Sequence, residues 1–276
     1  MNIPNIINNY RKVLRVSKHI TGFYLIFTAP FAGADDVQNG LRFSPMIVNY
    51  SEVDKKSGES ITIINNTKDI FLLKGSIRAM DTDTGRDSKA DSPLPDIVIL
   101  PPLARLEAEG QYIFRIRAVG DSLPKDRESA CIVSVTAIPA IDASLPQVAS
   151  EGTDISPGKT LPMNNGGGVS LQVALRMNIR LFYRPGGVPE RDNSDVSKQL
   201  RFYGSGKTLF IDNPTPYFLN LHDVSINGKK VRQDIIEGYV RPKETRSFSL
   251  DMPVEGVVAW IFGGEKSERR ATITTH

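Results

Sequence analysis

The longest alternation of hydrophobic and polar residues in this chain runs from Val169 to Tyr183. Apolar side chains fall at every second position, and mostly small or polar ones stand between them. A period of two predicts a β-strand with one face turned to an apolar environment. A strand usually has about five or six residues, and this one is far longer. We therefore expect it to cross more than one environment.

Shorter apolar or alternating runs, separated by turn residues, recur along the rest of the chain. No segment shows a sustained apolar period of about 3.6 residues with helix caps. The pattern predicts an all-β fold of sandwich or barrel type, and Asn227-Gly228 predicts a hairpin turn. Before the long strand we expect strands at 43–50, 60–64, 70–79, 97–100, 112–119 and 131–138. After it we expect strands at 200–203, 208–211, 217–221, 224–226, 246–250 and 257–262.

Two breaks in the pattern suggest how the chain is divided. Residues 140–168 are rich in Ser, Gly, Pro and Asn, and predict a long loop that opens directly into the long strand. Loops of this length are uncommon inside compact domains and are often functional. The residues from Arg184 to Pro189 predict an interdomain connection. We expect an N-terminal domain over residues 35–184 and a smaller C-terminal domain over residues 185–276.

Residues 1–34 predict a cleavable export signal. Basic residues precede an apolar run from Ile20 to Phe31, and Ala32-Gly33-Ala34 resembles a cleavage site. The alternative is a membrane anchor, but the run is shorter than the roughly 20 residues that a spanning helix needs. The whole chain carries a net charge of +3, and without the basic signal it is close to neutral. Composition therefore gives no case for nucleic-acid or membrane-surface binding.

Signals for catalysis or metal binding are weak. The three histidines, His19, His222 and His276, have no metal-pair spacing, and no nucleophile elbow surrounds any serine. The string from Gly204 to Thr208 resembles the end of a phosphate-binding loop, but Arg201 stands where that motif needs glycine and a strand follows. We interpret it as a hairpin turn, and we expect neither enzymatic activity nor a cofactor. The single Cys131 excludes an internal disulfide and predicts a buried thiol.

Two features of the long strand each allow two interpretations. Arg180, on its polar side, is either a solvent-exposed arginine or an anchor for a carboxylate, which the guanidinium fork fits. Its position beside the interdomain connection favours the anchor. The apolar face that begins at Val169 either fills its own core or lies at a sheet edge and offers side chains to a partner strand. The long loop before it favours the edge.

Several short strings stand in one order along the chain: residues 123–129 (LPKDRES), 137–139 (AIP), 174–185 (ALRMNIRLFYRP) and 212–217 (DNPTPY), with Pro101-Pro102 and Arg105-Leu106 as a further match. In this order they resemble the periplasmic pilus (fimbrial) chaperones of the chaperone–usher pathway. The resemblance implies two immunoglobulin-like domains set in an L shape. It also implies a periplasmic chaperone that binds pilin subunits and delivers them to an outer-membrane usher.

The resemblance assigns a role to the long strand. In the family, the last strand of the first domain is lent to a subunit that lacks its own final strand. Such a subunit exposes an apolar groove and unpaired backbone groups, and a borrowed strand satisfies both. Arg180 corresponds to a cleft lysine that holds the subunit's C-terminal carboxylate. The apolar side chains lent to the groove would be Val169, Leu171, Val173, Leu175 and Met177.

Two departures from the family pattern concern charged residues. A second cleft base, on the first strand, falls at Ile47, where no base stands, and Arg42 is the nearest substitute. Glu128 and Arg184 match two members of an interdomain charge network. Its third member, an acid expected just before Gly263-Gly264, is absent there, because Ile261 and Phe262 stand in its place. The hinge between the domains is therefore expected to be held differently.

The loop over residues 140–168 resembles the long F1–G1 loop subclass of the family, which often has a disulfide nearby that Cys131 alone cannot form. A strand left without a subunit could pair with that of a second copy. The competing interpretation is a structural or adhesive subunit of a surface fibre with immunoglobulin-like domains. Such a subunit would lack the cleft arginine and the interdomain motif.

Overall fold

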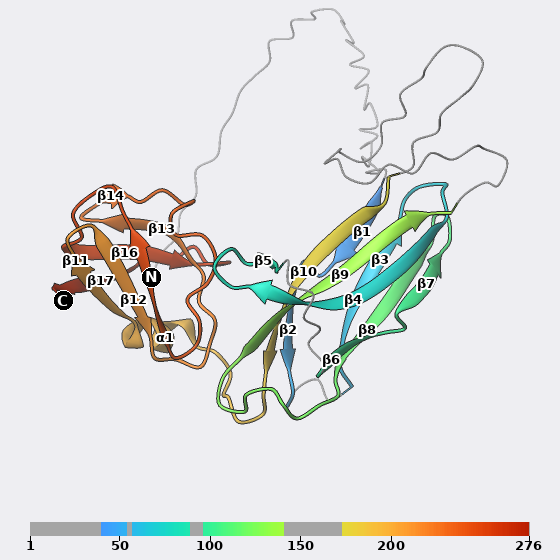
Figure 1. Cartoon of the computed structure of the whole chain (residues 1–276), viewed down its shortest axis with the longest axis horizontal. Coiled ribbons are helices and arrows are strands. Elements are labelled where there is room, and N and C mark those ends of the chain that lie inside the picture. Colours follow the sequence, from blue (N-terminus) through green and yellow to red (C-terminus); the bar gives the residue numbers. More distant parts are fainter. Residues whose placement is uncertain (1–39, 54–56, 89–95, 141–172, 276) are drawn as a thin grey trace, which may run out of the picture. The chain divides into compact units, whose positions relative to one another are not determined.

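The computed structural model describes residues 40–53, 57–88, 96–140 and 173–275. Their regular secondary structure is almost entirely β-strand, with one short helix, in two domains (Figure 1). The prediction of an all-β, two-domain protein is confirmed, whereas the L-shaped arrangement and the boundary at residue 184 stay predictions. The expected signal peptide and most of the predicted long loop lie outside the described residues. No helix in the described part is long and apolar enough to cross a membrane.

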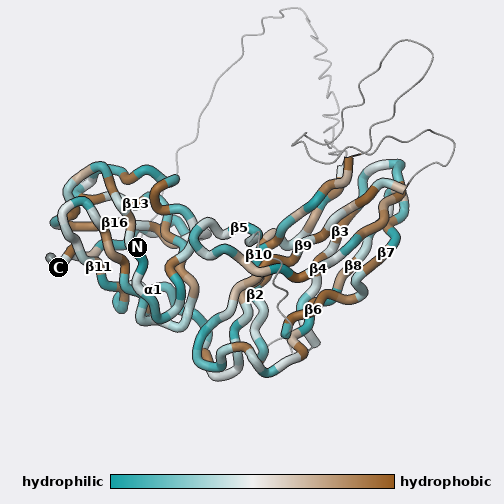
Figure 2. Tube along the Cα trace, viewed as in Figure 1, coloured by the Kyte–Doolittle hydropathy of each residue, from teal (hydrophilic) through white to brown (hydrophobic). Residues whose placement is uncertain are grey.

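The first domain consists of two sheets that share one core. The strands are β1 (Leu41–Ser44), β2 (Ile47–Ser51), β3 (Glu59–Asn65), β4 (Phe71–Asp81), β5 (Arg86–Asp87), β6 (Ile97–Leu100), β7 (Leu103–Leu106), β8 (Gln111–Ala118), β9 (Ser129–Pro139) and β10 (Leu175–Arg184). One sheet has the order β1-β3-β8-β6, and the other has the order β2-β10-β9-β4-β5 with β7 beside β4. Hydrophobic residues lie along β3, β9 and β10 (Figure 2) and form the core between the sheets.

The strand predicted over residues 43–50 is in fact two strands in different sheets. β1 pairs with β3 in an antiparallel arrangement, whereas β2 pairs with β10 in a parallel one. Pro45 stands between them, and proline has no N–H to donate to a continuing ladder. The chain therefore leaves one sheet here and joins the other beside the second half of β10.

β10 has different neighbours along its length. β9 pairs with it from Leu175 to Tyr183, but β2 pairs with its other side only from Arg180 to Arg184. Among the described residues, β10 before Arg180 is therefore an edge. Leu175 and Met177 are half-buried against the core of their own domain. Both interpretations of the apolar face thus apply to these two residues, because they pack inward and also stand at an edge.

The second domain is one sheet with the order β14-β13-β16-β17-β11-β12-β15. Its elements are α1 (Asn193–Gln199), β11 (Arg201–Ser205), β12 (Thr208–Asn213), β13 (Leu221–Ile226), β14 (Lys229–Lys230), β15 (Glu244–Ser249), β16 (Gly256–Phe262) and β17 (Arg269–Thr275). The sheet surrounds its own core, in which the rings of Phe202 and Trp260 lie 4.7 Å apart.

Three details of the second domain differ from the sequence prediction, and one is strand β17, in the middle of the sheet, which was not predicted. Helix α1 was not predicted, since seven residues are too few to show a helical period; Asp192 caps it by accepting a hydrogen bond from the N–H of Ser194. The strand predicted over residues 217–221 is irregular, with a single bridge between Leu219 and Val240. Both predicted hairpins are confirmed: β13 and β14 flank Asn227-Gly228, and β11 and β12 flank Gly206.

Candidate functional site

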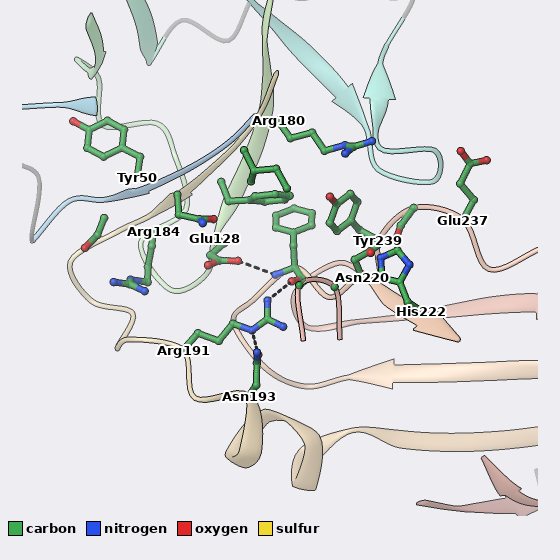
Figure 3. A pocket seen from close by; sticks show the side chains of 18 of the residues that line it. Tyr50, Glu128, Arg180, Arg184, Arg191, Asn193, Asn220, His222, Glu237 and Tyr239 are labelled. Atoms are coloured by element: carbon green, nitrogen blue, oxygen red, sulfur yellow. Dashed lines mark hydrogen bonds between the residues drawn. The ribbon is translucent and has the colours of Figure 1, made fainter. Parts of the chain in front are cut away.

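One face of β2 and β10 turns away from the core of the first domain and lines a cavity. Because side chains alternate along a strand, Arg180, Phe182 and Arg184 share this face of β10, and Ile47 and Asn49 share it on β2. All five line a cavity of about 780 Å³. Its remaining walls come largely from the second domain (Figure 3).

Arg180 is a half-buried cation on the wall of this cavity. Its Nε donates a hydrogen bond to the carbonyl oxygen of Gly85, at 2.7 Å. No carboxylate of the described residues forms an ion pair with it, and Glu237, an acid of the same cavity, is paired with Arg86 at 2.7 Å. The terminal nitrogens of the guanidinium can therefore receive an anion from outside the chain.

Ile47 lies directly across from Arg180 on β2. This is the position at which the family's second base was sought, and the side chain there is apolar and 45% exposed. Arg42 lies on β1 in the opposite sheet, where it pairs with Ile64 and is exposed. It does not line the cavity, so the structure does not bring Arg42 and Arg180 together.

Glu128 connects the two domains at this cavity. Its backbone N–H donates to the carbonyl oxygen of Pro216, and its carboxylate accepts a hydrogen bond from the N–H of Phe218, each at 2.8 Å. Burial raises the pKa of Glu128, against the opposing effects of the Phe218 hydrogen bond and of nearby Arg191 and Arg184. Glu128 and Arg184, both predicted interdomain residues, thus line the same cavity as Arg180.

The turn that meets Glu128 is fixed by Asn213, whose side chain is completely buried. A buried amide whose donors and acceptor are all satisfied holds the backbone around it in place. Pro216 and Phe218 are thereby presented to Glu128 in a fixed geometry, which gives a physical reason for the DNPTPY string. The partners of the Asn213 side chain are Thr215, Tyr217, Val240 and Arg241.

Arg191 is a hinge residue that sequence reasoning missed. Its Nη1 donates to the carbonyl oxygen of Phe218 at 3.1 Å, and its Nε bonds to the side chain of Asn193. Asn193 in turn donates to a carboxylate oxygen of Glu265 at 2.6 Å. The acid sought before Gly263-Gly264 therefore has a counterpart just after the glycine pair. Searching both sides of that pair would have found it.

A second contact between the domains comes from the turn between β4 and β5, which sequence reasoning also missed. The N–H of Tyr239 donates to the carbonyl oxygen of Thr82 at 2.9 Å, and Nη2 of Arg246 donates to that of Asp83 at 3.0 Å. Gly238 has a φ of +88°, and a Cβ there would lie 2.1 Å from the Asp83 carbonyl oxygen. Only glycine permits this approach.

A small apolar cluster fills the space between these two contacts. The ring of Phe182 lies 5.1 Å from that of Tyr239 and 5.6 Å from that of Phe218. Aromatic pairs at such distances stabilise beyond the area that they bury. The cluster consists of Met80, Ile132, Phe182, Phe218 and Tyr239. It joins β4, β9 and β10 of the first domain to the second domain.

The predicted apolar donor residues lie away from this cavity, toward the start of β10. Val173 precedes the strand and is 40% exposed. Leu175 and Met177 follow on the same side, half-buried. Val169 and Leu171 lie outside the described residues. The first half of β10 is therefore an apolar edge, and its second half lines a charged cavity. Arg180 lies at the boundary between the two.

Two family models match the chain. The model described as "Pili and flagellar-assembly chaperone, PapD N-terminal domain" matches residues 40–189, and "Pili assembly chaperone PapD, C-terminal domain" matches residues 195–262. A probable fimbrial chaperone of Escherichia coli O157:H7, LpfB, is 29% identical and is aligned over 85% of this chain and 87% of its own. The chaperone protein AfaB of Escherichia coli is 31% identical over 70% of each chain.

Solved structures with the same fold are also similar in sequence. The chaperone DraB of Escherichia coli superimposes with a TM-score of 0.61 at 27% identity, over 85% of this chain and 98% of its own. A structure described as the Salmonella enterica SafA pilin in complex with the SafB chaperone gives a TM-score of 0.60 at 26% identity, over 85% and 96% of the two chains.

We expect Glu128→Gln to change how stability depends on pH. The amide can still accept the hydrogen bond from Phe218, but it cannot ionise. Because burial raises the pKa of Glu128 above its ordinary value of 4.5, the folded protein binds this proton more tightly than the unfolded chain does. The unmodified protein should therefore gain stability relative to the variant below that value, and lose the gain as pH rises through the folded pKa.

Denaturant unfolding of both proteins between about pH 3.5 and 7.5 measures this difference. Glu107→Gln, which removes an exposed carboxylate of the same domain, is the matched control. A stability difference that is constant with pH, or that grows in the opposite direction, would contradict the assignment.

Proposed function

This chain belongs to the PapD family of pili and flagellar-assembly chaperones, and we propose that it holds fimbrial subunits through the edge of β10 and through Arg180. The chain is a chaperone of pilus assembly. Its relatives carry the names of fimbrial chaperones, which favours this function over that of a structural or adhesive fibre subunit.

The proposal is supported above all by the position at which β2 begins to pair with β10, at Arg180. A strand that docks on the edge before Arg180 cannot continue past it, because β2 already occupies the next positions. If that strand ends there, its C-terminal carboxylate meets the guanidinium of Arg180. The docked strand then runs parallel to β10, in the direction that β2 itself takes.

The edge of β10 supplies both kinds of contact that an incomplete subunit needs. Its outward backbone groups have no strand partner among the described residues before Arg180, and edges of this kind recruit strands. Val173, Leu175 and Met177 place apolar side chains along the same edge. By the same alternation, Val169 and Leu171 extend this series in the direction of the loop.

The remaining parts of the proposal follow from family membership. The SafB chaperone, a similar protein, is described in complex with a pilin, and we assign the same class of partner to this chain. An outer-membrane usher would receive the subunit. Residues 1–34 would direct the chain to the periplasm and be removed. Binding by strand pairing and one ion pair requires no nucleotide or metal.

Arg180→Ala should weaken subunit binding by roughly ten- to hundredfold, the loss that follows from removing hydrogen bonds to a charged group. Co-expression with fimbrial subunits encoded near its gene, followed by pull-down and titration, measures the effect. Arg176→Ala is the matched control, because Arg176 lies on the same face of β10 but does not line the cavity. Equal retention of subunit by Arg180→Ala and the unmodified chaperone would refute the anchor.

Val173→Asp should prevent capture of the subunit, because it places a charge where an apolar groove must close. Val257→Asp is the matched control: Val257 is 43% exposed, close to the 40% of Val173, but belongs to the second domain. Both variants should remain folded by circular dichroism. Normal subunit binding by Val173→Asp would exclude this edge as the docking strand.

A further inference from the structure

Tyr239 has a buried ring and a hydroxyl group without a partner. The residue is only 8% exposed, and its ring packs against those of Phe182 and Phe218. Within the described part of the chain its hydroxyl makes no hydrogen bond, and the residue lines the same cavity as Arg180 (Figure 3). The hydroxyl oxygen itself is not among the buried unpaired atoms of the described residues, so it is open to the cavity. A phenol in this position can donate a hydrogen bond to a ligand that enters the cavity.

Tyr239 and Arg180 meet at Gly85. A Cβ atom added to Gly85 would lie 2.9 Å from Cε2 of Tyr239 and 3.3 Å from Nε of Arg180. The two atoms are thus no farther apart than the sum of these distances. Cε2 is bonded to the ring carbon that carries the hydroxyl, so the phenol and the guanidinium border one small region of the cavity.

The residue directly across from Arg180 on β2 supplies no second donor. Nε of Arg180 is already bonded to Gly85, and Ile47, directly across on β2, offers no polar group. A carboxylate has about four lone-pair sites, and leaving them unsatisfied in a half-buried site is unfavourable. Tyr239 can supply a donor in addition to the terminal nitrogens of Arg180. Burial raises its pKa above the ordinary value of 10.0, which keeps the phenol protonated.

Three acids line the cavity, Glu128, Glu190 and Glu237, and among the described residues none of them forms an ion pair with Arg180. Glu237 forms an ion pair with Arg86, and Glu128 accepts its hydrogen bond from Phe218. Both carboxylates therefore have partners elsewhere. The region between Arg180 and Tyr239 has one positive charge and one neutral donor, which suits a monovalent carboxylate.

We propose that the hydroxyl of Tyr239 donates a hydrogen bond to the subunit's C-terminal carboxylate, as a second donor beside Arg180. This inference rests on the proposed function and adds a residue from the second domain to its anchor. The carboxylate is then held by both domains. Subunit binding consequently depends on the contacts that keep Tyr239 against β10.

The test uses a peptide of eight alternating threonine and valine residues with an N-terminal fluorescein, made with either a carboxylate or an amide at its C-terminus. Fluorescence anisotropy gives the affinity of each form for the full chaperone. The unmodified protein should bind the acid at least about tenfold more tightly than the amide. Tyr239→Phe should reduce that ratio severalfold and leave the affinity for the amide unchanged.

Two further variants make the outcomes distinguishable. Tyr112→Phe, which removes a hydroxyl far from the cavity on β8, should retain the full ratio, and Arg180→Ala should lose it. If Tyr239→Phe keeps the ratio while Arg180→Ala loses it, the inference is wrong and the proposed function stands. If the unmodified protein binds both forms equally, the carboxylate anchor fails and the inference fails with it. Tyr239→Phe should unfold at the same temperature as the unmodified protein.

Discussion

The parallel pairing of β2 with β10 begins at Arg180, and the binding surface proposed for this chaperone depends on that starting point. Before Arg180, β10 has β9 on one side and an unpaired edge on the other; after it, both sides are occupied. The break originates in the sequence of β1 and β2, where Pro45 interrupts what would otherwise be one strand. Had β2 begun a few residues earlier, it would have covered the edge.

The proposed binding surface depends also on the contact between the two domains. Glu128 and the turn held by Asn213 join them on one side, and the β4–β5 turn with Gly238 joins them on the other. The aromatic cluster around Phe182 lies between these contacts. Because each contact uses directional hydrogen bonds to backbone groups, the cavity wall is specified at several separate points. A cavity built in this way can present fixed donors to a ligand.

Local patterns predicted much of this arrangement. Alternation predicted most of the strands, and Asn227-Gly228 predicted a hairpin. The same alternation predicted that Arg180 lies on the face opposite the core. The apolar character of Ile47 was also evident from sequence. These features depend on neighbours in the chain or on a period of two, and both can be read from one sequence.

What could not be predicted depends on contacts between distant segments. Arg191 and Glu265 meet through Asn193 only because the first residue of helix α1 lies within hydrogen-bond distance of the turn after β16, and a seven-residue helix leaves no periodic signal. Gly238 looks like any loop glycine until Asp83 of the other domain lies against it. Arg42 was close to Ile47 in sequence, but the change of sheet at Pro45 separates the two.

In the proposed anchor, the phenol of Tyr239 takes the place of a second base at position 47, and this changes the electrostatics of the site. A second base at position 47 would stand directly across from Arg180, and two like charges in a half-buried cavity repel each other whenever no carboxylate lies between them. A phenol supplies a hydrogen bond without that repulsion, but it adds no long-range attraction for an anion. Without a ligand, the cavity then has less electrostatic repulsion between its cations, and recognition of the carboxylate relies more on geometry than on charge.

Since Tyr239 belongs to the second domain, that geometry is set by the packing of Tyr239 against Phe182 and by its backbone bond to Thr82. In the proposed anchor, the domain interface is therefore part of the binding site.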